Sequence, residues 1–179
     1  MIDFSRNHFE LFGLPARYRF DAPTLDQAYR ALQSRVHPDA AAGGTDAERR
    51  VALQSSARVN EAYQALRDPV RRAQYLLSLH GIETVNERDT VLPIDFLEQQ
   101  LARREAASDA QQTGDEPALA ALRAEVRAEA VAIEEQLAHM LDGEAAYGAA
   151  RTRVRELTFL AKLADDIDAM LGALDAGED

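Results

Sequence analysis

Two amphipathic segments separated by a short polar connection constrain the fold of this chain more than any other feature. Both carry apolar residues at the spacing of a single helix face, which predicts helices over about 22–37 and 46–67. The apolar positions are Leu25, Tyr29, Leu32 and Val36 in the first segment and Ala52, Val59, Ala62, Tyr63 and Leu66 in the second. Helices joined by so short a connection are expected to lie antiparallel, so the sequence predicts a helical hairpin with a polar tip.

Residues with known preferences at helix ends mark where these helices start and stop. Asp21 is a candidate N-cap for the first helix. Pro38 ends that helix, because proline disfavours helical backbone at the residue before it. Asp68 and Pro69 are typical of an N-cap followed by the first helical position, so a third helix is expected to run from there to about His80.

The composition agrees with packed helices and excludes several other classes of protein. Hydrophobic residues make up 46% of the 179 positions but aromatic residues only 6%, a balance that favours an all-α fold. Without cysteine, the chain can form neither a disulfide nor a thiolate metal site. No apolar stretch approaches the ~18 residues of a membrane span. No secretory signal is visible at the N-terminus, so the expected compartment is a bacterial cytoplasm.

Charge is distributed unevenly between the two halves of the chain. Residues 1–80 hold 11 Arg against 9 Asp and Glu, whereas residues 81–179 hold 9 basic against 22 acidic residues, which leaves net charges of +2 and −13. A strongly acidic half disfavours nucleic acid or an anionic membrane as the main ligand, because both require a basic footprint. The asymmetry indicates two functional halves, although acidic helix faces also serve simply to keep a protein in solution.

The C-terminal half has the pattern of a three-helix bundle. Prolines and glycines divide it into helical segments of about 93–112, 117–142 and 144–175. The last two segments carry near-heptad apolar seams, which predict a left-handed arrangement with short turns. The expected organisation is an N-terminal helical domain, a connector and a C-terminal three-helix bundle, over 1–80, 81–92 and 93–179.

The tripeptide His37-Pro38-Asp39 falls at the tip of the predicted hairpin. Pro38 stiffens the loop and the polar residues beside it project outward, an arrangement that suits docking to another protein better than chemistry. Arg30 and Arg35 on the preceding helix lead up to the tripeptide with a modest basic surface. The alternative is a plain helix stop in which Asp39 acts as an N-cap.

A helix, the His-Pro-Asp loop, a second helix and then the run over 60–69 together resemble a J domain. In that family the loop and the preceding helix dock on the ATPase domain of a DnaK-type chaperone and stimulate its ATP hydrolysis. The resemblance implies that Asp39 accepts a hydrogen bond from an arginine of the ATPase domain. It also implies that the other two residues of the tripeptide hold the loop shape, and that Arg30 and Arg35 make electrostatic contacts.

The chain departs from the common J-domain pattern in its charges. Many J domains have Lys directly after the tripeptide and a strongly basic docking helix. This chain has Ala40 at that position, and its helix carries Asp26 beside the two arginines. Since charges at the rim of an interface mainly set the association rate, the departure predicts weaker steering or a specialised chaperone partner.

The remaining segments resemble the HscB-type co-chaperones of iron–sulfur cluster assembly. The similarity extends from Phe4 to about Leu174 and is carried by 3–15, 75–81, 96–101 and 159–163. In that family a patch on the C-terminal domain binds the scaffold protein IscU, and the J domain engages the DnaK-type chaperone HscA. The resemblance therefore implies a co-chaperone that presents IscU to HscA, stimulates its ATPase and promotes cluster assembly and transfer.

Apolar side chains outside the bundle seams are the candidates for scaffold binding. Phe159 lies two residues beyond the seam residue Leu157, or roughly 200° around the helix, and Leu163 follows it by one turn. Leu97 and Leu101 are also one turn apart, and exposed apolar clusters often mark an interface. By the resemblance, the scaffold-binding residues are Leu97, Leu101, Phe159, Phe96 and Leu163.

Two features bear on that assignment. The alternative is that these side chains are buried between helices, as most large apolar residues are, with Phe96 the first candidate for the core. The family often has Met where this chain has Glu98, so that contact is expected to be lost or replaced by a polar one.

Enzyme classes find little support in the sequence. It contains no Walker-type loop, no dinucleotide-binding glycine pattern and no G-x-S-x-G turn. The four histidines lack metal-ligand spacing, and the cysteine-based zinc module of some relatives is missing, so neither a metal nor another cofactor is expected. Two other functions stay open: a general J-domain cofactor that delivers unfolded clients, and a helical adaptor with no link to a chaperone.

Overall fold

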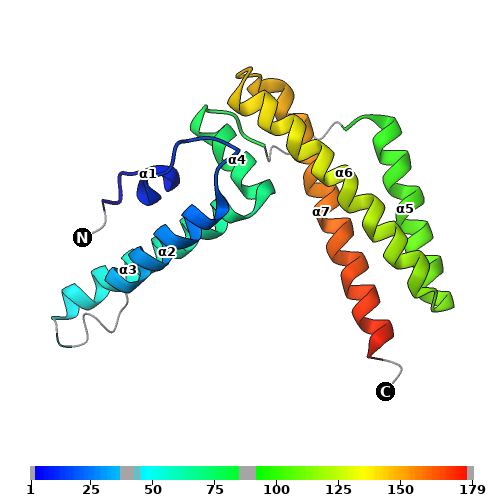
Figure 1. Cartoon of the computed structure of the whole chain (residues 1–179), viewed down its shortest axis with the longest axis horizontal. Coiled ribbons are helices and arrows are strands. Elements are labelled where there is room, and N and C mark those ends of the chain that lie inside the picture. Colours follow the sequence, from blue (N-terminus) through cyan, green and yellow to red (C-terminus); the bar gives the residue numbers. More distant parts are fainter. Residues whose placement is uncertain (1–2, 37–42, 44, 85–91, 177–179) are drawn as a thin grey trace. The chain divides into compact units, whose positions relative to one another are not determined.

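The computed structural model describes residues 3–36, 43, 45–84 and 92–176, and within them every regular element is a helix (Figure 1). The helices are α1 (His8–Phe12), α2 (Ala22–Val36), α3 (Asp46–Arg67), α4 (Pro69–Leu79), α5 (Ile94–Thr113), α6 (Glu116–Asp142) and α7 (Tyr147–Asp175). The chain divides into two compact units, 1–76 and 77–179. The all-α prediction is confirmed, and none of the described helices is long and apolar enough to cross a bilayer.

The predicted hairpin is formed by α2 and α3, which lie side by side in the first unit (Figure 1). Their cross-helix contacts run in opposite directions along the two helices. Near its start α2 contacts the end of α3, through Asp26 and Tyr63, and near its end it contacts an earlier turn of α3, through Gln33 and Ser56. This order of partners confirms the antiparallel prediction.

The predicted N-caps are also confirmed. The carboxylate of Asp21 accepts a hydrogen bond from the backbone N–H of Thr24 at 3.1 Å. Asp68 accepts one from the backbone N–H of Arg71 at 2.8 Å. Each bond satisfies a backbone donor that has no partner within its own helix, which fixes where α2 and α4 begin.

His8 is a buried histidine in the core of the first unit. Its ring stacks on Tyr75 with centroids 4.0 Å apart, and its backbone N–H donates to the Tyr75 hydroxyl at 2.9 Å. Burial lowers the pKa of His8, and the charge of Arg58 lowers it further, whereas Glu61 opposes the shift. The neutral imidazole therefore serves as a packing group in the folded chain.

Stability of the first unit is expected to fall with pH because of His8. Its pKa is about 6.5 in the unfolded chain and lower in the folded one, so below about pH 6.5 the unfolded state binds more protons. The contribution of His8 is complete above that pH and is lost as the pH falls towards the lowered pKa. We expect His8→Gln to flatten the pH dependence of the free energy of unfolding between about pH 7.5 and 5.5, measured by urea titration.

The control for this prediction is His139→Gln, which removes an exposed histidine of the other unit. We expect this variant to keep the slope of the original chain. If His8→Gln also kept that slope, the proposed role of the buried ring in pH sensitivity would be wrong.

The second unit is the predicted three-helix bundle of α5, α6 and α7. The expected seams are buried: Leu119, Val126, Ile133 and Leu137 on α6, and Val154, Leu157, Ile167 and Leu171 on α7. Gly114, in left-handed backbone at φ 68°, ends α5 and allows the short turn into α6. The last helix begins at Tyr147 and not at 144, because Ala145 takes a left-handed conformation at φ 51° that a helix cannot include.

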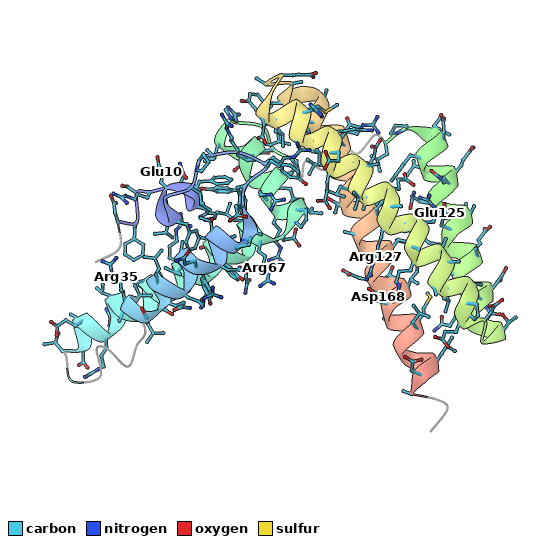
Figure 2. The ribbon with its side chains drawn as sticks, viewed as in Figure 1. Glu10, Arg35, Arg67, Glu125, Arg127 and Asp168 are labelled. Carbon is cyan, nitrogen blue, oxygen red and sulfur yellow. The ribbon has the colours of Figure 1, made fainter. Side chains whose placement is uncertain are left out.

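Ion pairs between helices add polar contacts to the bundle. Arg103 of α5 is buried and reaches two carboxylates of α6, Glu125 at 2.7 Å and Glu129 at 2.6 Å. Asp168 of α7 accepts from Arg127 of α6, and Figure 2 shows these two side chains facing one another. Burial alone would raise the pKa of Asp168, but hydrogen bonds and charge from α6 lower it. These carboxylates are therefore structural, as expected for helix faces, and not acid–base pairs.

Candidate functional site

The tripeptide His37-Pro38-Asp39 lies outside the described residues, and the structure describes its two flanks. On one side α2 ends at Val36. On the other, Thr45 caps α3 in a capping box, in which its side chain accepts from the N–H of Glu48 while the Glu48 carboxylate accepts from the N–H of Thr45. This reciprocal bond fixes the first turn of α3 directly after the loop.

Arg30 and Arg35 of α2 are both exposed, as expected of docking residues. They lie five positions apart, which is roughly 140° around a helix. The two guanidinium groups therefore occupy different faces of α2 and do not form one basic stripe. Arg35 lies in the last turn before the loop, and Figure 2 labels it towards that end of the hairpin.

A polar seam runs along the edge of the hairpin on the side of Arg30. Tyr29 and Tyr63 stack across α2 and α3, with ring centroids 4.0 Å apart. The Tyr29 hydroxyl donates to Asn60 at 2.9 Å, and the Tyr63 hydroxyl donates to Asp26 at 2.8 Å. The acidic residue that distinguishes this docking helix is thus bonded within the hairpin.

The candidate scaffold-binding residues separate into exposed and buried ones. Leu97, Leu101 and Phe159 are 43%, 59% and 40% exposed, so their predicted exposure is confirmed. Phe96 is only 8% exposed and meets the Phe159 ring edge-on at 6.4 Å, so it supports that ring from beneath. Leu163 is 2% exposed, so the prediction that it continues an exposed strip is wrong. It belongs to the core because α7 packs against both other helices of the bundle.

Sequence reasoning missed Ile94, the first residue of α5. It is 71% exposed and lies three and seven positions before Leu97 and Leu101, the spacing of one helix face. That spacing was visible in the sequence, next to the helix-starting Pro93. We call Ile94, Leu97, Leu101 and Phe159 the apolar strip. Glu98 lies exposed beside it on α5.

Neither surface has the groups that chemistry needs. Among the residues that the structure describes, no three His, Cys, Asp or Glu side chains gather where they could hold a metal ion. What the two surfaces offer is a hairpin edge with arginines in one unit and exposed apolar side chains in the other. Exposed apolar clusters of this kind are suited to binding another protein.

Comparison with known families decides which kind of protein this is. Residues 7–75 match the DnaJ domain, and residues 92–168 match the HSCB C-terminal oligomerisation domain. The chain is 47% identical over 171 residues to the co-chaperone protein HscB homolog of Ralstonia nicotianae, covering 96% of this chain and 97% of that protein. The chain belongs to the HscB family of co-chaperones. A Burkholderia mallei HscB homolog is 45% identical over 175 residues, covering 98% of this chain and 99% of that one.

Solved HscB structures share the fold. Chaperone HscB from Vibrio cholerae aligns with a TM-score of 0.84 at 39% identity, over 94% of this chain and 99% of that one. The human co-chaperone protein HscB aligns with a TM-score of 0.86 at 25% identity, over 93% of this chain and 83% of that one. Both predicted resemblances, to a J domain and to HscB, are confirmed.

Membership in the HscB family also narrows the functional class. The relatives are named as co-chaperones and not as enzymes, and a J-domain co-chaperone acts with a DnaK-type chaperone. An HscB-type chain with a J domain has a co-chaperone role in iron–sulfur cluster assembly. The adaptor with no link to a chaperone therefore loses its support.

Proposed function

We propose that this HscB-type chain binds the scaffold protein IscU through the apolar strip and presents it to the DnaK-type chaperone HscA. The J domain, proposed over 1–80, stimulates the HscA ATPase through Asp39 and its neighbours, and the domain over 93–179 carries the scaffold. The observation that supports this most is the exposure of Leu97, Leu101 and Phe159 on a unit separate from the hairpin. One chain thus offers two binding surfaces, one for each partner.

The benefit of two surfaces on one chain is effective concentration. Once the J domain has bound the chaperone, a scaffold held by the same chain meets the chaperone at the local concentration set by the tether and not at its bulk concentration. Delivery of the scaffold and hydrolysis of ATP are then coupled without any direct contact between the two binding surfaces.

The apolar strip would form the centre of the scaffold interface and not all of it. An interface of standard size buries about 800 Å² on each partner, more than four side chains supply. Interfaces place apolar anchors at the centre and polar groups at the rim. The exposed neighbours Glu98, Arg104 and Glu105 of α5 are suited to that rim. Glu98 here takes the place of an apolar contact common in the family.

The second candidate is a general J-domain cofactor that delivers unfolded clients, since an apolar strip would also hold an extended apolar peptide. Calorimetric titration of the full chain with folded scaffold, and separately with an unfolded apolar peptide, distinguishes the two. We expect saturable binding of the scaffold and at least about tenfold weaker binding of the peptide, a difference of about 1.4 kcal/mol. Tighter binding of the peptide would favour the general cofactor.

A further inference from the structure

We infer that Arg67, at the end of α3, is a docking residue for the ATPase domain of the DnaK-type chaperone and acts beside Arg30 of α2. We also infer that Asp26 is neutralised within the hairpin and does not repel that partner. Both inferences rest on the proposed docking of the J domain on the chaperone. They name a contact outside the tripeptide and its helix, from an element to which the sequence assigned no role.

The geometry joins Arg67 to the docking helix. Its Nη1 donates to the Tyr63 hydroxyl at 2.5 Å, and that hydroxyl donates in turn to Asp26 at 2.8 Å. The guanidinium carbon lies 5.6 Å from the centroid of the Tyr63 ring, within the range of a cation–π contact. Tyr63 is itself held by its stack on Tyr29. The tyrosine thus fixes an arginine of α3 beside a carboxylate of α2.

The charges on this edge then favour an acidic partner. Asp26 is bonded through Tyr63 to Arg67, so its charge is offset locally. Arg30 lies one turn after Asp26 and is exposed, with no ion-pair partner among the described residues. Two cations and one anion leave the edge positive. Positive patches meet negative ones in interfaces that are electrostatically steered, so the occupant is an acidic surface of the chaperone's ATPase domain.

Arg67 also lies within reach of a footprint that includes the tripeptide. Its guanidinium reaches back to Tyr63 and so lies level with Asp26, which is 11 residues before His37. At 1.5 Å per residue, the distance along α2 is roughly 16 Å. A standard interface of about 800 Å² per partner is roughly 28 Å across. Figure 2 shows Arg67 and Arg35 towards opposite ends of the hairpin, which brackets that span.

The test is a titration of the chaperone ATPase with the full chain carrying Arg67→Gln, at low and at physiological salt. We expect the concentration for half-maximal stimulation to rise about threefold to fivefold at low salt, with the maximal rate unchanged and a shallower dependence on salt. The matched control is Arg17→Gln, which removes an exposed positive charge outside α2 and α3. A titration of Arg67→Gln that matches that of the control would overturn the inference. So would a salt-independent loss accompanied by a lower melting temperature, which would make Arg67 purely structural.

The neutralisation of Asp26 is tested separately with Asp26→Asn. Asparagine keeps an oxygen that accepts from Tyr63, so half-maximal stimulation is expected within about twofold of the original chain. Tightening of fivefold or more would show that Asp26 repels the partner and would contradict this inference. If the original chain failed to stimulate the ATPase at all, the proposed function itself would fail, which is a different result from an inert Arg67→Gln.

Discussion

Replacing Asp39 by asparagine is expected to remove most of the stimulation of the chaperone ATPase. By its resemblance to J domains, Asp39 supplies a carboxylate to an arginine of the ATPase domain. Asparagine preserves the size of the side chain but not its charge. Removing one member of a desolvated, hydrogen-bonded charge pair costs about 2–5 kcal/mol, so at least about 30-fold more protein should be needed for the same stimulation. The measurement is steady-state ATP hydrolysis by the chaperone.

The control for Asp39→Asn is Asp46→Asn. Asp46 is an exposed carboxylate in the first turn of α3, close along the chain to the same loop, and it pairs with Arg49. Loss of this surface charge should leave stimulation within about twofold, since exposed ion pairs contribute little. Equal stimulation by the original chain and by Asp39→Asn would show that the tripeptide is not the docking element.

Replacing Phe159 by alanine is expected to weaken scaffold binding by about 30-fold, which corresponds to about 2 kcal/mol. Aromatic anchors at the centre of an interface typically carry such a share of the binding energy. Phe159 is suited to this role because its ring is held edge-on by the buried Phe96 and is still 40% exposed. Calorimetric titration with folded scaffold measures the change.

The fold of the Phe159→Ala variant is expected to survive. A fully buried Phe costs about 3–5 kcal/mol when truncated, and a half-exposed one costs less because fewer contacts are lost. Val131→Ala is the matched control, since Val131 is a comparably exposed apolar residue on α6, outside the apolar strip. It should bind the scaffold as the original chain does. Unfolding of Phe159→Ala at physiological temperature would instead assign Phe159 to the core.

The helices could be predicted well from sequence because each depends on a local pattern. The hairpin and bundle seams repeat at helical spacing, and residues such as Asp21 and Asp68 mark helix starts through bonds only three residues long. The start of α7 was missed by three residues because the conformation of Ala145 has no signal in its side chain.

The errors at the candidate sites have non-local causes. Leu163 lies only roughly 40° around α7 from the exposed Phe159, so a helix-face argument alone groups the two. The structure separates them because α7 contacts α5 as well as α6, which widens its buried face. Asp26 likewise looked unfavourable for docking. Its partner Tyr63 is 37 positions away and becomes visible only when the register of the hairpin is known.

The most direct test of a bridging role is the ATPase rate of the chaperone with this chain alone, with folded scaffold alone, and with both together. We predict that the rate with both exceeds the sum of the two separate stimulations, and that either Asp39→Asn or Phe159→Ala removes this excess. Rates with both proteins that are merely additive would show that the two surfaces work independently and would contradict a bridging co-chaperone.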